Sequence, residues 1–276
     1  LGYNALGAST TGSKNIAIGL TAMGATDVTG ADNIAIGRTS MDALLAGTAN
    51  IALGVNALGA ATSGSYNVAL GHTALGGATL TGNSNIALGI NSMDALTSGA
   101  CNVALGTNAL GAATTGCSNV AIGTGAIDTG VVTGNYNTAI NLSALQDVTS
   151  GKENVAIGAD AMKNLTTGCV NIAIGSSALA GAVVTGINNI AIGTSTMDAL
   201  TSGICNVAIG ANALGAATTG CLNVAIGSTA MSGGAVTGCY NVVVGVAGMA
   251  LTSGRNNTVM GRNAAAALTT GCDNIA

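Results

Sequence analysis

Cysteine is the residue type whose chemistry and spacing are most informative in this chain. Five of the seven cysteines lie two residues before a recurring asparagine: Cys117, Cys169, Cys221, Cys239 and Cys272. The other two, Cys101 and Cys205, lie one residue before it. The first of these positions also holds Lys152 and Arg255, which indicates a surface position. Surface thiols of extracellular proteins tend to be paired.

Cys221 and Cys239 are the pair that the spacing places on successive repeats. If the repeats stack as strands, the two Cα atoms lie about 4.8 Å apart, within the range of a disulfide. The other cysteines of this position would need a partner from another chain. Two interpretations stay open: a possible disulfide between Cys221 and Cys239, or cysteine as a small apolar filler.

Other reactive residues are sparse. His72 is the only histidine and there is no C-x-x-C, so a zinc site is not expected. Asp42, Asp94 and Asp198 share one turn position in M-D-A-L segments, where we expect them to cap turns. A calcium-binding roll would need an aspartate in every coil. With no nucleophile–base constellation and no phosphate-binding glycine loop, we predict no enzymatic activity, no cofactor and no metal.

The composition points to a structural protein. Only 6% of the residues are charged, the net charge is −4, and the chain has 44 glycines but no proline, phenylalanine or tryptophan. No basic stripe is present for nucleic acid, and no apolar run approaches the roughly 20 residues of a membrane helix. We therefore predict neither nucleic-acid binding nor membrane insertion. Because the chain starts at Leu1 and stops within a motif, we expect an excerpt of a longer chain.

A repeat positions these residues. The segment N-[IV]-A-[IL]-G recurs, and its asparagine is taken as position 0. The sixteen asparagines are Asn15, Asn33, Asn50, Asn67, Asn85, Asn102, Asn119, Asn137, Asn154, Asn171, Asn189, Asn206, Asn223, Asn241, Asn257 and Asn274. Successive asparagines are about 17 or 18 residues apart, in a cycle of one long and two short intervals with a single shorter exception near the C-terminus. Three repeats therefore make a 52-residue super-repeat.

The repeat predicts short strands separated by turns. Position +1 is β-branched, and glycine bounds the segment on both sides. We predict an all-β parallel β-solenoid, or β-roll, of 17–18-residue coils, each with two strands of about five residues, continuous over residues 1–276. A three-sided helix with a 52-residue turn is the structural alternative, although duplication of a three-coil block explains the same period.

Two columns of the repeat are expected to hold the turns. All sixteen repeats have glycine at position −3, beginning with Gly12 and Gly30, which predicts positive φ or close backbone contact. The asparagines, beginning with Asn15 and Asn33, are expected to bond from coil to coil as a ladder, or else only to tolerate the turn. Position +4 is glycine except at Asn141, so we predict positive φ there rather than a need for smallness alone.

Alternation within the segment separates two faces. We expect the large residues at +1 and +3, together with the Leu or Met at +8, to fill the coil interior. The alanine at +2 then faces outward as a flat apolar surface that suits packing against another copy. The alternative is that the alanines line a thin coil of a single chain.

These repeats resemble the head repeats of trimeric autotransporter adhesins and the T-T-G-x-x-N-x-A-I-G-x-x-A-L repeats of phage tail-fibre proteins. The resemblance covers the whole chain, although adhesin head repeats are usually shorter, so that the coil here is wider. It implies a homotrimeric β-roll used for attachment at the surface of a virion or cell, hence an extracellular location. A receptor or glycan would bind through regions outside this segment. The alternative function is an ice- or crystal-binding solenoid that uses its Ser/Thr column.

Overall fold

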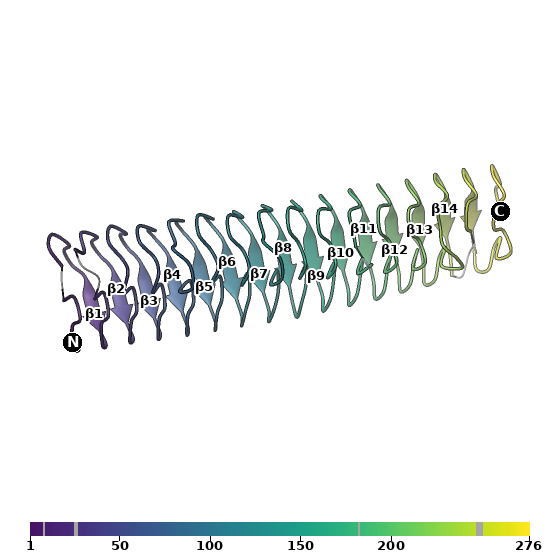
Figure 1. Ribbon diagram of the computed structural model, residues 1–276. Helices are drawn as coiled ribbons and strands as arrows, with labels where there is room; N and C mark the ends of the chain where they lie inside the picture. The colour runs from purple at the N-terminus through teal and green to yellow at the C-terminus, as the bar shows by residue number, and fades with distance from the viewer. Residues whose placement is uncertain (8, 25–26, 182, 247–250) are drawn as a thin grey trace. The chain divides into compact units, whose positions relative to one another are not determined.

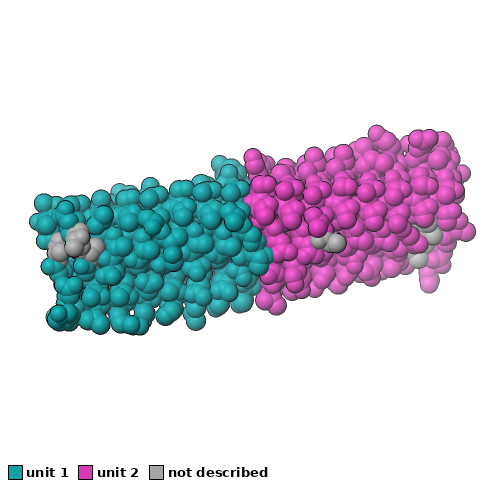
Figure 2. All heavy atoms as spheres, in the orientation of Figure 1, with its two compact units in different colours: residues 1–136 teal, residues 137–276 magenta. Residues whose placement is uncertain are grey.

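The computed structural model describes residues 1–7, 9–24, 27–181, 183–246 and 251–276. It is a parallel β-solenoid with coils of about 17 residues, and these ranges contain no helix. The chain divides into two compact units, Leu1–Tyr136 and Asn137–Ala276, which Figure 2 colours separately. The expectation of one continuous solenoid over residues 1–276 stays a prediction.

Each coil contributes one three-residue strand, at positions +1 to +3. The first unit holds β1 (Ile16–Ile18), β2 (Ile34–Ile36), β3 (Ile51–Leu53), β4 (Val68–Leu70), β5 (Ile86–Leu88), β6 (Val103–Leu105) and β7 (Val120–Ile122). The second holds β8 (Thr138–Ile140), β9 (Val155–Ile157), β10 (Ile172–Ile174), β11 (Ile190–Ile192), β12 (Val207–Ile209), β13 (Val224–Ile226), β14 (Val242–Val244) and β15 (Thr258–Met260).

Within each unit, consecutive strands pair in parallel and in register (Figure 1). Ala17 lies opposite Ala35 in the first unit, and Ala139 lies opposite Ala156 in the second. Partner residues are therefore one repeat apart along the sequence. This register confirms that one repeat makes one coil, and it rules out the 52-residue turn.

The expectation of two five-residue strands in each coil is wrong. Opposite the three-residue strand, neighbouring coils form isolated bridges, such as Ser9 with Val28, and further backbone hydrogen bonds, such as Leu45 N to Thr62 O (3.0 Å), but no second strand. The backbone explains the difference, because positions +6 and +8 have positive φ, for example 55° at Asn108 and 53° at Leu110. A strand cannot continue through residues in the left-handed region.

The two faces of the strand are the reverse of the sequence prediction. In the coil of β6, Ala104 is completely buried, whereas Val103 and Leu105 are half-exposed. The interior is narrow, and Ala104 shares it with Ala109 at position +7 and Leu110 at position +8. Two large residues per strand would overfill this space, so the thin alanine-lined coil is the correct alternative.

The +8 residues are buried as predicted. Met41, Leu58 and Met93 are at most 1% exposed, and Met249 lies outside the described residues. The coil of β15 departs from the usual residue types at two interior positions. Val259 replaces the usual alanine at +2, and Ala265 replaces the usual large residue at +8.

The 18-residue repeats place their extra residue in a bulge on the side opposite the strand. Val132, at position −5, bridges to Ala113, which is at position −6 of the preceding coil. Val132 is fully buried, while the residue before it, Val131, is 63% exposed. The extra residue is therefore displaced outward, and the interior keeps its width.

Candidate functional site

The outward face of the strand is the most extensive candidate surface. At β2 the chain alternates between outside and inside. Asp32 and Arg38 are exposed, Ile36 is 36% exposed, Ile34 is half-buried, and Ala35 is fully buried. Positions +1 and +3 thus share the outward face of the strand, and the exposed residues at −1 and +5 flank it along the chain.

The centre of this face is an apolar ladder, defined as the residues at +1 and +3 of every strand. They are isoleucine, valine or leucine except at Thr138, Thr258 and Met260. The more exposed aliphatic members are each 36% to 48% accessible: Ile16, Ile18, Ile36, Ile51, Leu53, Ile86, Ile122, Ile174, Ile209 and Ile226. A contiguous exposed apolar surface marks an interaction site more often than scattered apolar residues do.

The asparagines form a ladder along each unit. Asn33 Nδ2 donates to Asn15 Oδ1 (3.1 Å) and to the carbonyl of Gly47 (2.9 Å). The same Oδ1 of Asn15 also accepts the backbone N–H of Asn33 (2.9 Å). Asn50 repeats the pattern one coil on, with Nδ2 bonded to Asn33 Oδ1 and to the carbonyl of Gly64. Each amide therefore satisfies turn groups of neighbouring coils inside the solenoid.

Glycine at position −3 is required by close backbone contact. A Cβ on Gly12 would lie 2.7 Å from the carbonyl oxygen of Gly30, and a Cβ on Gly30 would lie 2.0 Å from that of Gly47. Neither glycine has positive φ. Of the two reasons that the sequence offers for this column, close approach is the one that the structure shows.

Position +4 combines positive φ with close approach. The glycines of this column have φ between 123° and 152°, and Asn141 has φ of 104°. A Cβ on Gly54 would also lie 2.4 Å from the carbonyl oxygen of Gly71. The expectation that conformation alone sets this column is therefore incomplete. At Asn141 the side chain also accepts a hydrogen bond, from the backbone N–H of Leu142 to Oδ1 (2.8 Å).

Sequence reasoning missed three further positive-φ positions. Residues at −1, +6 and +8 are left-handed, including Tyr66 (59°), Asn56 (58°) and the β-branched Ile127 (52°). The +6 column carries a usable signal, because it holds several asparagines and Gly125, which adopt this conformation readily. The +8 column, which holds mostly leucine and methionine, carries none.

Cys221 and Cys239 are joined by a disulfide between successive coils. The S–S distance is 2.26 Å and the Cα atoms lie 4.7 Å apart. The two residues also form an isolated β-bridge. The covalent link thus repeats a contact that the backbone already makes.

The side chains of three free cysteines, Cys117, Cys169 and Cys272, make local hydrogen bonds. Cys117 Sγ accepts the backbone N–H of Ala100 (3.4 Å). Other coils fill the same role with other side chains, since Ser65 Oγ accepts from Thr48 N (3.1 Å). A polar small side chain at position −2 therefore has a structural use, which the interpretation of cysteine as an apolar filler overlooked. Cys101 and Cys272 are exposed, and Cys169 and Cys205 are half-buried.

The aspartates at +9 lie in the turns beside small neighbours. Burial raises the pKa of Asp94, although hydrogen bonds from its own backbone N–H and that of Ala95 oppose the shift. Burial also raises the pKa of Asp128, and the charge of Asp94 adds to the effect. The pKa of Asp198 is raised by burial as well.

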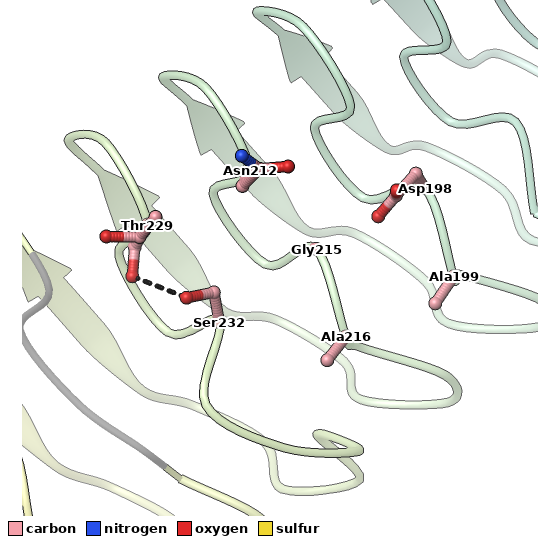
Figure 3. A pocket seen from close by; sticks show the side chains of 7 residues that line it. All are labelled: Asp198, Ala199, Asn212, Gly215, Ala216, Thr229 and Ser232. Carbon is pink, nitrogen blue, oxygen red and sulfur yellow. Dashed lines mark hydrogen bonds between the residues drawn. The ribbon is translucent and has the colours of Figure 1, made fainter.

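Asp198 lines a shallow recess of about 520 Å³ (Figure 3). The other lining residues are Ala199, Asn212, Gly215, Ala216, Thr229 and Ser232. They come from successive coils and offer one carboxylate, one amide and two hydroxyls. Ser232 Oγ donates to the carbonyl of Thr229 (3.0 Å), so its hydroxyl is not held by a base. The recess can accept hydrogen bonds but has no nucleophile–base pair.

The remaining candidate residues do not converge. His72 is exposed, and its Nδ1 lies 3.4 Å from Oγ1 of the adjacent Thr73. Among the residues that the structure describes, no group of three His, Cys, Asp or Glu side chains could hold a metal. The described ranges also contain no helix long and apolar enough to cross a membrane.

Comparison with protein-family models and with curated proteins finds no match to this chain.

Proposed function

We propose that this chain is a non-enzymatic structural segment of an extracellular fibre. The fibre would be a phage tail fibre, a bacterial surface adhesin or a related filament, and it would act in attachment. Copies of the chain associate with one another through the outward strand face. Three copies form the fibre, a number that rests on the resemblance of the repeats to adhesin heads and tail fibres.

The apolar ladder carries this proposal. Burying a whole aliphatic side chain removes roughly 100 Å² from water, so a side chain about 40% exposed still offers about 40 Å². Because most other ladder positions are less exposed, the fourteen positions of β1–β7 offer at most about 550 Å², and the sixteen of β8–β15 at most about 650 Å². Stable protein interfaces bury about 800 Å² per partner, so the residues at −1 and +5 that flank each ladder must contribute the rest of the contact.

A second copy is the partner that this surface fits best. The ladder has no charged residue, and its rows repeat at the strand spacing of about 4.8 Å. Another copy offers the same apolar rows at the same spacing. Corresponding rows can then pack along each stacked unit, whereas a globular partner would match only a few of them.

Paired lysine substitutions test the proposed interface. Val207→Lys with Ile209→Lys places two charges in the ladder at β12, while Ser202→Lys with Thr219→Lys places two charges at exposed positions of the −4 column. Light scattering after size exclusion should show dissociation of the first variant to monomers and an unchanged oligomer for the second. A ladder variant that keeps the wild-type mass would refute the interface.

An ice- or crystal-binding solenoid is the second candidate. The Ser/Thr column at position −4 is exposed in all sixteen repeats, with Ala46 as its one exception in residue type. Several of its hydroxyls are already used within the chain, because Thr29 Oγ1 donates to Leu45 O (3.1 Å) and Thr237 Oγ1 to Thr252 O (3.2 Å). Thermal hysteresis of the purified protein separates the two functions, since a fibre segment should show none.

A further inference from the structure

The two edges of the outward face differ in charge. The −1 edge is the column of residues before the asparagines, and its charged members are Lys14, Asp32, Glu153 and Asp273. The +5 edge is the column after the position +4 glycines, and its charged members are Arg38 and Arg262. One edge is therefore mainly acidic, and the other carries arginine and no acid.

Asp32 and Arg38 are the only charged residues that occupy both edges of one coil. They flank β2, and both side chains are exposed. The ladder residues Ile34 and Ile36 lie between them along the chain. Across the described part of the chain, neither side chain takes part in an ion pair.

The direction in which two copies pack decides which edges meet. If both solenoids point the same way and their faces meet, the strands of the two copies run in opposite directions across the contact. The −1 edge of one copy then lies against the +5 edge of the other. If the solenoids point in opposite ways, each edge meets its own kind, and the acidic edges face each other. A ring of copies around an axis parallel to the solenoids requires the first arrangement.

We propose that copies of this chain pack side by side, pointing the same way and in register, with Asp32 of one copy paired to Arg38 of the next. This inference rests on the proposed self-association and adds its direction and register. The ladder repeats at every coil, so a shift by one coil would still match its apolar rows. A charged pair at one coil removes that ambiguity. Charges at the rim of an interface contribute mainly to orientation and specificity.

Charge exchange tests the pairing. The variants are Asp32→Arg, Arg38→Asp and the double exchange, studied by sedimentation equilibrium at low salt with a reducing agent. Lys14 and Tyr66 already occupy the −1 column with positive φ, so arginine fits there. Each single variant should weaken association by about tenfold, because a trimer loses three rim pairs. The double exchange should restore the wild-type constant.

Glu153→Arg is the matched control. It makes the same change on the same edge, but its coil has Ala159 on the opposite edge. It should change the association constant by less than about twofold. A wild-type protein that is monomeric would overturn the proposed function itself. An oligomer that tolerates both single variants, or that the double exchange fails to restore, would overturn the pairing and leave the proposed function intact.

Discussion

Replacing one asparagine of the ladder should loosen the solenoid locally and strongly. Asn67 is fully buried, and its Nδ2 donates to Asn50 Oδ1 (3.2 Å) and to Gly82 O (3.0 Å). Its Oδ1 accepts from Asn85 N (2.9 Å) and Asn85 Nδ2 (3.1 Å). Asn67→Ala removes all four bonds at once.

The expected cost follows from the groups that lose their partners. The carbonyl of Gly82 and the backbone N–H of Asn85 would both stay buried without these hydrogen bonds. An unsatisfied buried group costs about 1–3 kcal/mol, so the substitution should destabilise the surrounding coils by about 4 kcal/mol. Because each coil of a solenoid contacts mainly its neighbours, distant coils should keep their stability.

Hydrogen exchange followed by mass spectrometry measures this effect coil by coil. Peptides that cover residues 50–99 should show an opening free energy lower by about 4 kcal/mol, and peptides of the second unit should be unchanged. Ser63→Ala is the control, since Ser63 is exposed in the same coil. The ladder would be refuted as a source of stability if Asn67→Ala lowered the opening free energy by less than about 1 kcal/mol, or by no more than Ser63→Ala does.

Three further outcomes are expected. Asn141→Gly should leave stability unchanged or raise it by up to about 1 kcal/mol, whereas Asn141→Val should lower it by about 1–3 kcal/mol because φ is positive; urea unfolding that ranks the variants in reverse would contradict this. Reduction of the Cys221–Cys239 disulfide, which spans 18 residues, should lower the stability of its coils by about 3 kcal/mol, measured by hydrogen exchange with and without reductant. Asp128→Asn should stabilise at pH 7, because a folded-state pKa raised above its unfolded value makes ionisation unfavourable to folding. The gain should disappear below the unfolded pKa of about 3.9, and a gain that persists there in urea titrations would contradict the assignment.

The sequence was sufficient for the coil and for its polar ladder. The spacing of Asn15, Asn33 and Asn50 predicts the coil length, and the register of Ala17 with Ala35 confirms it. Both predictions succeed because they depend on which residue types recur at one position, and a fixed period brings those residues together in the fold.

The direction of the two strand faces could not be obtained in the same way. Alternation shows that Val103 and Leu105 share one face and that Ala104 lies on the other, but not which face is inside. That depends on the width of the coil. The width is set by the left-handed residues at +6 and +8, and Leu110 in that conformation has no signature in the sequence.

The location of the candidate interaction surface depends on which strand face points outward. With the large residues outside, the surface available for association is the ladder rather than the column of alanines. The edge residues Asp32 and Arg38 bear on association only in that arrangement, because they flank the ladder. Sequence reasoning assigned the proposed self-association to the alanine face, which the structure places inside the coil.

Sedimentation equilibrium of the wild-type protein under reducing conditions tests self-association most directly. Reduction removes disulfides between chains as a cause of larger species. The chain has a mass of 26.0 kDa, so the proposed trimer should sediment at about 78 kDa at micromolar concentration. A single species of 26.0 kDa at all concentrations would contradict the central claim, because the apolar ladder would then be a surface that binds no second copy.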